Sequence, residues 1–171
     1  SYSSRRVFTD AVRLIDAVRG FDFVDPIAVA VTGGSQGGAI SLAVAGLVPG
    51  LQAVMPDVPF LCDFRRSVEL TPDAPFTELR NYLAIHRDIV DETFTTLAYF
   101  DGVNFARRAT APARFSVALM DPIVLPSTVF AAYNDYAGDD REIDVYPYNG
   151  HEGGQGHQWV TQARWLAERS R

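Results

Sequence analysis

Apolar and polar positions follow two different periods along this chain. From Phe8 to Val18, apolar residues recur at the i, i+3, i+4, i+7 spacing, which predicts an amphipathic helix over residues 5–20 that ends at Gly20. Residues 27–32 instead form a continuous run of mainly small and β-branched residues, typical of a strand buried on both faces of a parallel sheet. The same patterns predict further strands at 53–60, 114–120 and 143–148, and further helices at 36–48, within 75–109, at 127–137 and at 156–171.

The order of these elements predicts an α/β fold. Strands that alternate with helices form parallel βαβ units with right-handed crossovers. In such sheets, ligands bind at the carboxyl ends of the strands. The loops that leave those ends here follow Thr32, Met120 and Tyr148, so we expect the functional residues to lie in these loops.

Composition narrows the classes of partner. The chain has 171 residues, of which 47% are hydrophobic, enough for one domain with a sizeable core. The net charge is −6, from 15 Lys and Arg against 21 Asp and Glu, which argues against nucleic acid and anionic membranes as partners. The only cysteine is Cys62, so an internal disulfide and a cysteine-based metal cluster are excluded, and we expect its thiol to be buried. No pattern of a signal peptide or membrane span is visible, and we expect a cytoplasmic protein.

A glycine-rich turn follows the first predicted strand. Its sequence, GGSQGG over residues 33–38, fits the G-x-S-x-G pattern of a nucleophile elbow, in which a serine sits on a strained turn between a strand and a helix. The helix that begins at Gln36 would direct a free backbone N–H at an oxyanion formed at Ser35. A dinucleotide fingerprint would need glycine at position 35, and a phosphate-binding P-loop would need a lysine; a glycine-rich turn with an incidental serine remains the alternative.

A serine nucleophile needs a base and an acid. Elbow hydrolases carry them in the order serine, acid, histidine, which favours His151, in the loop after the last predicted strand. We interpret His86 as a solvated residue inside a helix and His157 as a capping or surface residue at the start of the last helix. The favoured acid is Asp121, at the end of the third predicted strand, and Asp57, at the end of the second, is its competitor.

Several blocks of the sequence together resemble one enzyme family. VTGGSQGG, VMPDVPFLCDFRR, YFDGVNFA, LMDPI and YPYNGHEGG occur in the order found in the acetyl xylan esterase / cephalosporin C deacetylase family of carbohydrate esterases. The resemblance implies a serine esterase with an α/β-hydrolase fold and neither cofactor nor metal, which deacetylates xylo-oligosaccharides and, in related members, cephalosporins. It assigns Ser35, Asp121 and His151 to the triad, the backbone of Gln36 to the oxyanion hole, and Phe60 and Ile123 to a small acyl pocket.

The resemblance also implies that this chain is only part of such an enzyme. Residues 1–171 would be the carboxyl-terminal part of one hydrolase domain, with about four of roughly eight strands and a helical insertion at about 63–109. The amino-terminal half would pair with the first predicted strand and supply the second oxyanion donor. Members of the family form hexamers, so we expect a homo-oligomer. The loop from Asp121 to Pro126 departs from the family pattern, which bears on substrate preference.

Two alternative functions remain open at this point. The chain could belong to another short-chain acyl hydrolase on the same fold, or it could be an inactive fragment that lacks half of the oxyanion hole.

Overall fold

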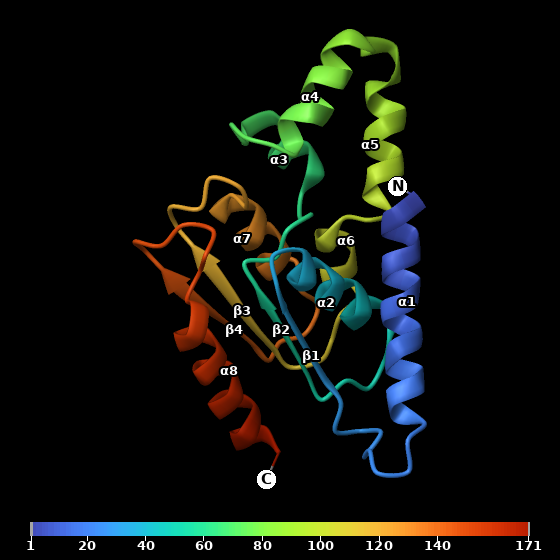
Figure 1. The fold of residues 1–171 in the computed structure, drawn as a ribbon, viewed down its shortest axis with the longest axis vertical. Helices are drawn as coiled ribbons and strands as arrows, with labels where there is room; N and C mark the ends of the chain where they lie inside the picture. Colours follow the sequence, from blue (N-terminus) through green and yellow to red (C-terminus); the bar gives the residue numbers. More distant parts are fainter. Residues whose placement is uncertain (1, 171) are drawn as a thin grey trace.

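The computed structural model describes residues 2–170 and contains one sheet of four parallel strands in the order β1-β2-β3-β4 (Figure 1). The strands are β1 (Ala30–Gly34), β2 (Ala53–Asp57), β3 (Ala113–Ala118) and β4 (Arg141–Tyr146). Each strand pairs in parallel with the next one in the chain. The predicted parallel α/β sheet is therefore confirmed, and all its carboxyl ends lie at one edge.

The helices connect the strands and cover both faces of the sheet (Figure 1). The segment of the predicted insertion, 63–109, contains four helices and one 3₁₀ turn between β2 and β3; α3, α4 and α5 rise above the carboxyl edge of the sheet, and α6 lies beside α2. The helical segments are α1 (Tyr2–Arg19), α2 (Gln36–Leu47), α3 (Phe64–Leu70), α4 (Phe76–Ile85), η1 (Arg87–Ile89), α5 (Val90–Ala98), α6 (Gly102–Ala106), α7 (Pro126–Asn134) and α8 (Gln155–Arg169).

The first strand begins later than the apolar run predicts. The sequence pattern predicts extended residues from Ile27 onward, but Asp25 draws Ile27 and Ala28 into a turn: its side chain accepts a hydrogen bond from Ile27 N–H, and its carbonyl accepts one from Ala28 N–H. Ile27 is consequently 75% exposed. Within residues 2–170, β1 pairs only with β2, so it is an edge strand and only partly buried, not buried on both faces as predicted.

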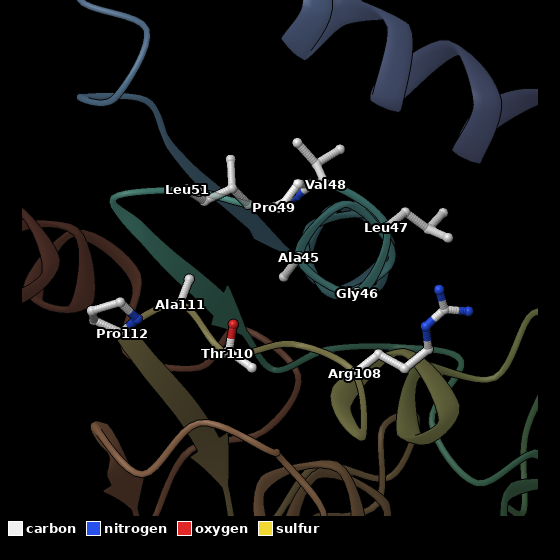
Figure 2. A pocket seen from close by; sticks show the side chains of 11 residues that line it. Ala45, Gly46, Leu47, Val48, Pro49, Leu51, Arg108, Thr110, Ala111 and Pro112 are labelled. Carbon is white, nitrogen blue, oxygen red and sulfur yellow. The ribbon is translucent and has the colours of Figure 1, made fainter.

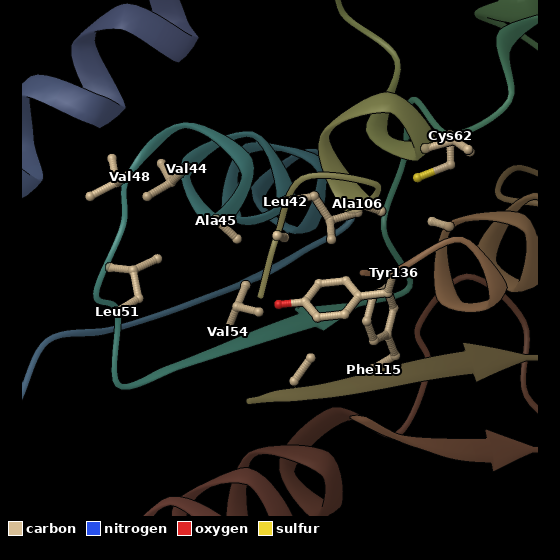
Figure 3. Packing of buried hydrophobic residues seen from close by; sticks show 14 of the residues in the cluster. Leu42, Val44, Ala45, Val48, Leu51, Val54, Cys62, Ala106, Phe115 and Tyr136 are labelled. Atoms are coloured by element: carbon tan, nitrogen blue, oxygen red, sulfur yellow. The ribbon is translucent and has the colours of Figure 1, made fainter. Parts of the chain in front are cut away.

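The two faces of the sheet differ in chemistry. On the side of α1, α2, α6 and α7, Val54 and Phe115 enter the main apolar core (Figure 3). The ring of Phe115 meets the rings of Tyr133 and Tyr136 edge to face at 5.6 Å. On the side of α8, Met55 contacts Trp165, but the neighbouring strands present charged and hydroxyl side chains. Cys62 is buried in the main core, as expected.

No helix within the described part of the chain has both the length and the apolar composition needed to cross a membrane.

We predict that Phe115→Ala lowers the free energy of unfolding by about 3–5 kcal/mol, because the side chain is fully buried and its removal leaves a cavity between β3 and α7. Phe23→Ala is the control, since Phe23 is 85% exposed, and it should cost less than about 1 kcal/mol. Urea unfolding followed by circular dichroism measures both, and equal losses in the two variants would contradict this account of the core.

Candidate functional site

Ser35 occupies the turn between β1 and α2 in a strained conformation. Its backbone has φ 53° and ψ −112°, outside the regions that side chains favour. Three hydrogen bonds hold it: its N–H donates to the carbonyl of Asp57 at 2.9 Å, and its own carbonyl accepts from Ala39 N–H at 3.1 Å and Phe60 N–H at 3.0 Å. The start of α2 and the segment after β2 therefore fix the serine in place.

The turn requires glycine because the backbone doubles back on itself. A Cβ built on Gly33 would lie 2.5 Å from the carbonyl carbon of Gly37, closer than atoms can approach. At the neighbouring Gly34, the nearest atom to such a Cβ is Asp57 Oδ2, at an ordinary 3.8 Å. The close approach of Gly33 to the first turn of α2 explains why the predicted elbow has glycine two residues before the serine.

The structure brings Ser35, His151 and Asp121 together at the carboxyl edge of the sheet. His151 Nε2 lies 2.9 Å from Ser35 Oγ, and His151 Nδ1 lies 2.8 Å from Asp121 Oδ2. The other carboxylate oxygen of Asp121 accepts from the backbone N–H groups of Ile123 and Val124, at 2.8 and 2.9 Å. Asp121 is only 3% exposed, so its position is set by the protein and not by solvent.

Hydrogen bonds within the last loop hold His151 over the serine. Glu152 accepts from the Asn149 side chain at 3.0 Å and from Gly150 N–H at 3.1 Å. The pKa of Glu152 is lowered by hydrogen bonds from its own backbone, from Asn149 and from Gly150, so its charge is retained to lower pH. Met120 N–H donates to the Asn149 carbonyl at 3.0 Å, which ties the histidine loop to the loop of Asp121.

The competing residues do not bond to Ser35 Oγ or to the imidazole of His151. Asp57 accepts a hydrogen bond from Ser116, not from a histidine. The prediction that His86 lies inside a helix is wrong. His86 is the C-cap of α4, and its ring packs on the ring of Tyr82 with 4.3 Å between the centroids. His157 lies in the first turn of α8 as an exposed residue that meets the Tyr146 ring edge-on, while Gly154 is the N-cap.

Two apolar side chains and one backbone donor complete the surroundings of Ser35. Phe60 N–H donates to the Ser35 carbonyl, and Ile123 N–H donates to the Asp121 carboxylate. The side chains of both residues are partly buried against the same cluster of Val117, Val124 and Val129. Gln36 is the first residue of α2, so its N–H has no acceptor within the helix and lies at the positive end of the helix dipole.

A separate hollow of about 470 Å³ lies at the opposite end of the sheet (Figure 2). It is bounded by the loops before β2 and β3, and Arg108 is its one charged lining residue. Its distance from the triad end of the strands excludes it from the candidate site. Within residues 2–170, no cluster of three His, Cys, Asp or Glu side chains is arranged to hold a metal ion.

Comparison with known proteins identifies the family of the chain. The family model for acetyl xylan esterase matches residues 1–169. The chain belongs to the acetyl xylan esterase family. This membership confirms the resemblance inferred from the sequence blocks.

Individual members of the family are similar in both sequence and structure. Acetyl esterase Axe7A of Xylanibacter ruminicola is 32% identical over 153 residues, which are 88% of this chain and 33% of that protein. The acetyl xylan esterase of Paenibacillus sp. R4 is 39% identical with a TM-score of 0.88, covering 95% of this chain and 52% of that one. Acetyl xylan esterase 1 of Thermoanaerobacterium sp. is 36% identical with a TM-score of 0.86, covering 96% and 52%.

These likenesses confirm the α/β-hydrolase fold. The chain spans a third to about half of the length of these relatives of the acetyl xylan esterase family.

The sequence pattern missed one group near the site. Asp57, Ser116 and Asp144 form a polar row across β2, β3 and β4, on the face that α8 covers. A signal was present, since polar residues alternate in the segments Ala113–Ala118 and Arg141–Tyr146, at positions 114 and 116 and at positions 142 and 144.

We predict that Gly33→Ala destabilises the chain by about 2–3 kcal/mol, because the new methyl group meets rigid backbone of α2 and the turn must open. Gly34→Ala is a matched control one residue away and should change the free energy of unfolding by less than about 1 kcal/mol. Urea unfolding compares the two variants, and a tolerated Gly33→Ala would show that the turn has more room than this geometry allows.

Proposed function

We propose that this protein is a serine esterase that removes O-acetyl groups from acetylated xylo-oligosaccharides, with Ser35 as nucleophile, His151 as base and Asp121 as the orienting acid. The observation that carries the proposal is the imidazole of His151, which bridges Ser35 Oγ at 2.9 Å and Asp121 Oδ2 at 2.8 Å. Membership of the acetyl xylan esterase family supports the acetyl ester as the bond that is cleaved.

The geometry supports a two-step displacement. Because Asp121 accepts at Nδ1, the proton of the neutral imidazole sits there, and Nε2 is free to take the Ser35 proton. Ser35 Oγ attacks the acetyl carbonyl, and the imidazolium then protonates the departing sugar alkoxide, which leaves an acetyl-serine. Water, deprotonated by His151, attacks that ester, and acetate leaves as Ser35 regains its proton.

The negative oxygen of each tetrahedral intermediate needs donors. The free N–H of Gln36 is one, and it is aimed by the same turn that exposes Ser35. In elbow hydrolases the second donor comes from a loop after an earlier strand. We assign that donor, and the strand that pairs with the open edge of β1, to an amino-terminal half of the same enzyme.

The remaining expectations concern substrate and assembly. We assign the partly buried side chains of Phe60 and Ile123 to a small acyl pocket, which would suit an acetyl substrate, including the acetyl ester of a cephalosporin. A homo-oligomer, hexameric as the family resemblance implies, remains part of this proposal, and size-exclusion chromatography with light scattering tests it.

We predict that Ser35→Ala in the complete protein lowers kcat for p-nitrophenyl acetate by at least about 10⁴-fold, because no other group can form the acyl-enzyme. Ser127→Ala, at an exposed position on α7, is the control and should keep wild-type activity. Steady-state kinetics gives both values, and substantial turnover by Ser35→Ala would remove this serine from the mechanism.

We also predict that kcat/KM of the wild type falls steeply from acetyl through butyryl to hexanoyl p-nitrophenyl esters. Ile123→Ala should flatten that series by raising the values for longer chains, because it removes bulk beside the acyl group. One apolar methylene is worth about 10–200-fold in such discrimination. A wild-type preference for long chains would favour a different acyl hydrolase on the same fold.

A further inference from the structure

A row of polar side chains crosses the sheet just below the candidate site, on the face that α8 covers. In the strand register, Asp57 of β2 pairs with Ser116 of β3, and Ser116 pairs with Asp144 of β4. One hydroxyl group therefore stands between two carboxylates. Such a row is unusual for strands of a parallel sheet, which are normally apolar on both faces.

The two carboxylates are compensated in different ways. Asp144 receives two hydrogen bonds from the guanidinium of Arg114, both at 2.7 Å, and a third from Gln158 at 3.1 Å. Asp57 is 7% exposed and accepts from the neutral hydroxyl of Ser116. The carboxylate of Asp57 is therefore buried and forms no ion pair with Arg114. It also has no role in the two-step displacement.

Asp57 contacts both segments that carry the reacting groups. Its backbone carbonyl accepts from Ser35 N–H at 2.9 Å, which holds the strained turn. A methyl group built on Gly153, two residues after His151, would lie 3.4 Å from Asp57 Oδ1, so the histidine loop passes directly over this carboxylate. Gly153 is buried and has φ +57°, a conformation that glycine adopts without strain.

We propose that Asp57 is a positioning residue of the esterase site: its backbone carbonyl holds the serine turn, and its carboxylate packs under the His151 loop and places a negative charge next to the imidazole. This inference rests on the proposed function. It does not make Asp57 a member of the triad, because its carboxylate is bonded to Ser116 and is too buried to meet substrate.

The charge of Asp57 and that of the imidazole act on each other. Burial raises the pKa of Asp57, the bond from Ser116 lowers it, the charge on Asp144 raises it and a positive charge on His151 lowers it. An ionised Asp57 attracts the positive charge of the imidazolium that forms in each step. The other ionisable groups in the surroundings are Tyr146 on β4, and Asp121 and Glu152 beside His151.

Asp57→Asn removes the negative charge but keeps the shape of the side chain, because the amide oxygen can still accept the hydrogen bond from Ser116. In the complete protein we expect the acidic limb of the kcat/KM profile to move to lower pH, since the imidazolium loses the attraction of the nearby negative charge. Asp57→Ala also removes the side chain that packs under the His151 loop, keeps the backbone carbonyl that binds Ser35 N–H, and should lower kcat by about 10–100-fold with little change in KM. Glu168→Gln, an exposed charge change on α8, should leave the profile in place.

A second measurement does not depend on activity. In the 171-residue chain, the NMR signal of the Gly153 amide, followed as a function of pH, should report the ionisation of Asp57. The pH midpoint of that change should rise in Ser116→Ala, which lacks the hydrogen bond that lowers the pKa of Asp57. The change should vanish in Asp57→Asn. If the wild type fails to cleave acetyl esters, the proposed function is wrong and this titration alone decides the role of Asp57. An unmoved acidic limb in Asp57→Asn, or a Gly153 signal that ignores Asp57, would overturn the inference.

Discussion

The hydrogen bond from Ser35 N–H to the carbonyl of Asp57 is the interaction on which the site depends. It continues the pairing of β1 with β2 by one residue beyond Gly34, at the point where the chain must leave the sheet and enter α2. A backbone φ of 53° at a residue other than glycine costs of order 1–3 kcal/mol, and this conformation persists only where neighbouring structure fixes the backbone. This bond holds the N–H of Ser35, and the bond from Phe60 N–H holds its carbonyl. Ser35 Oγ therefore stays in reach of His151 without any movement of the loops.

Much of the fold and of the candidate site follows from patterns that are local in the sequence. Strand ends are local signals, and parallel strands bring their carboxyl ends to one edge, which is why residues as distant as Ser35, Asp121 and His151 could be named together. The onset of β1 could not be predicted in this way, because the side chain of Asp25 competes with the sheet for the backbone. The row of Asp57, Ser116 and Asp144 depends on which helix covers which face of the sheet, and alternation within one strand does not reveal that.

One additional strand would account for both the open edge of β1 and the second oxyanion donor that we propose. Within residues 2–170, β1 has a partner on one side only, while α1 stands beyond it with an apolar stripe that includes Leu14 and Ile15 (Figure 1). A hollow of about 430 Å³ remains between α1 and β1. A further strand beside β1 would cover this surface and satisfy its free backbone groups. The loop after such a strand would emerge at the same edge as Gln36, where a second donor is required.

The polar row below the triad is costly for stability, which makes its position informative. A buried carboxylate that bonds only a hydroxyl gives up water without gaining an ion pair, so an apolar residue at Asp57 would pack at lower free-energy cost. The main core on the other face of the same strands accepts such residues throughout, as Val54 and Phe115 show. On the face that α8 covers, Arg114 pairs with Glu142 and Asp144, whereas Asp57 lies under the Ser35 turn and the His151 loop with a hydroxyl as its bonded partner. A charge kept there at the expense of stability is the arrangement expected where a developing imidazolium has to be stabilised.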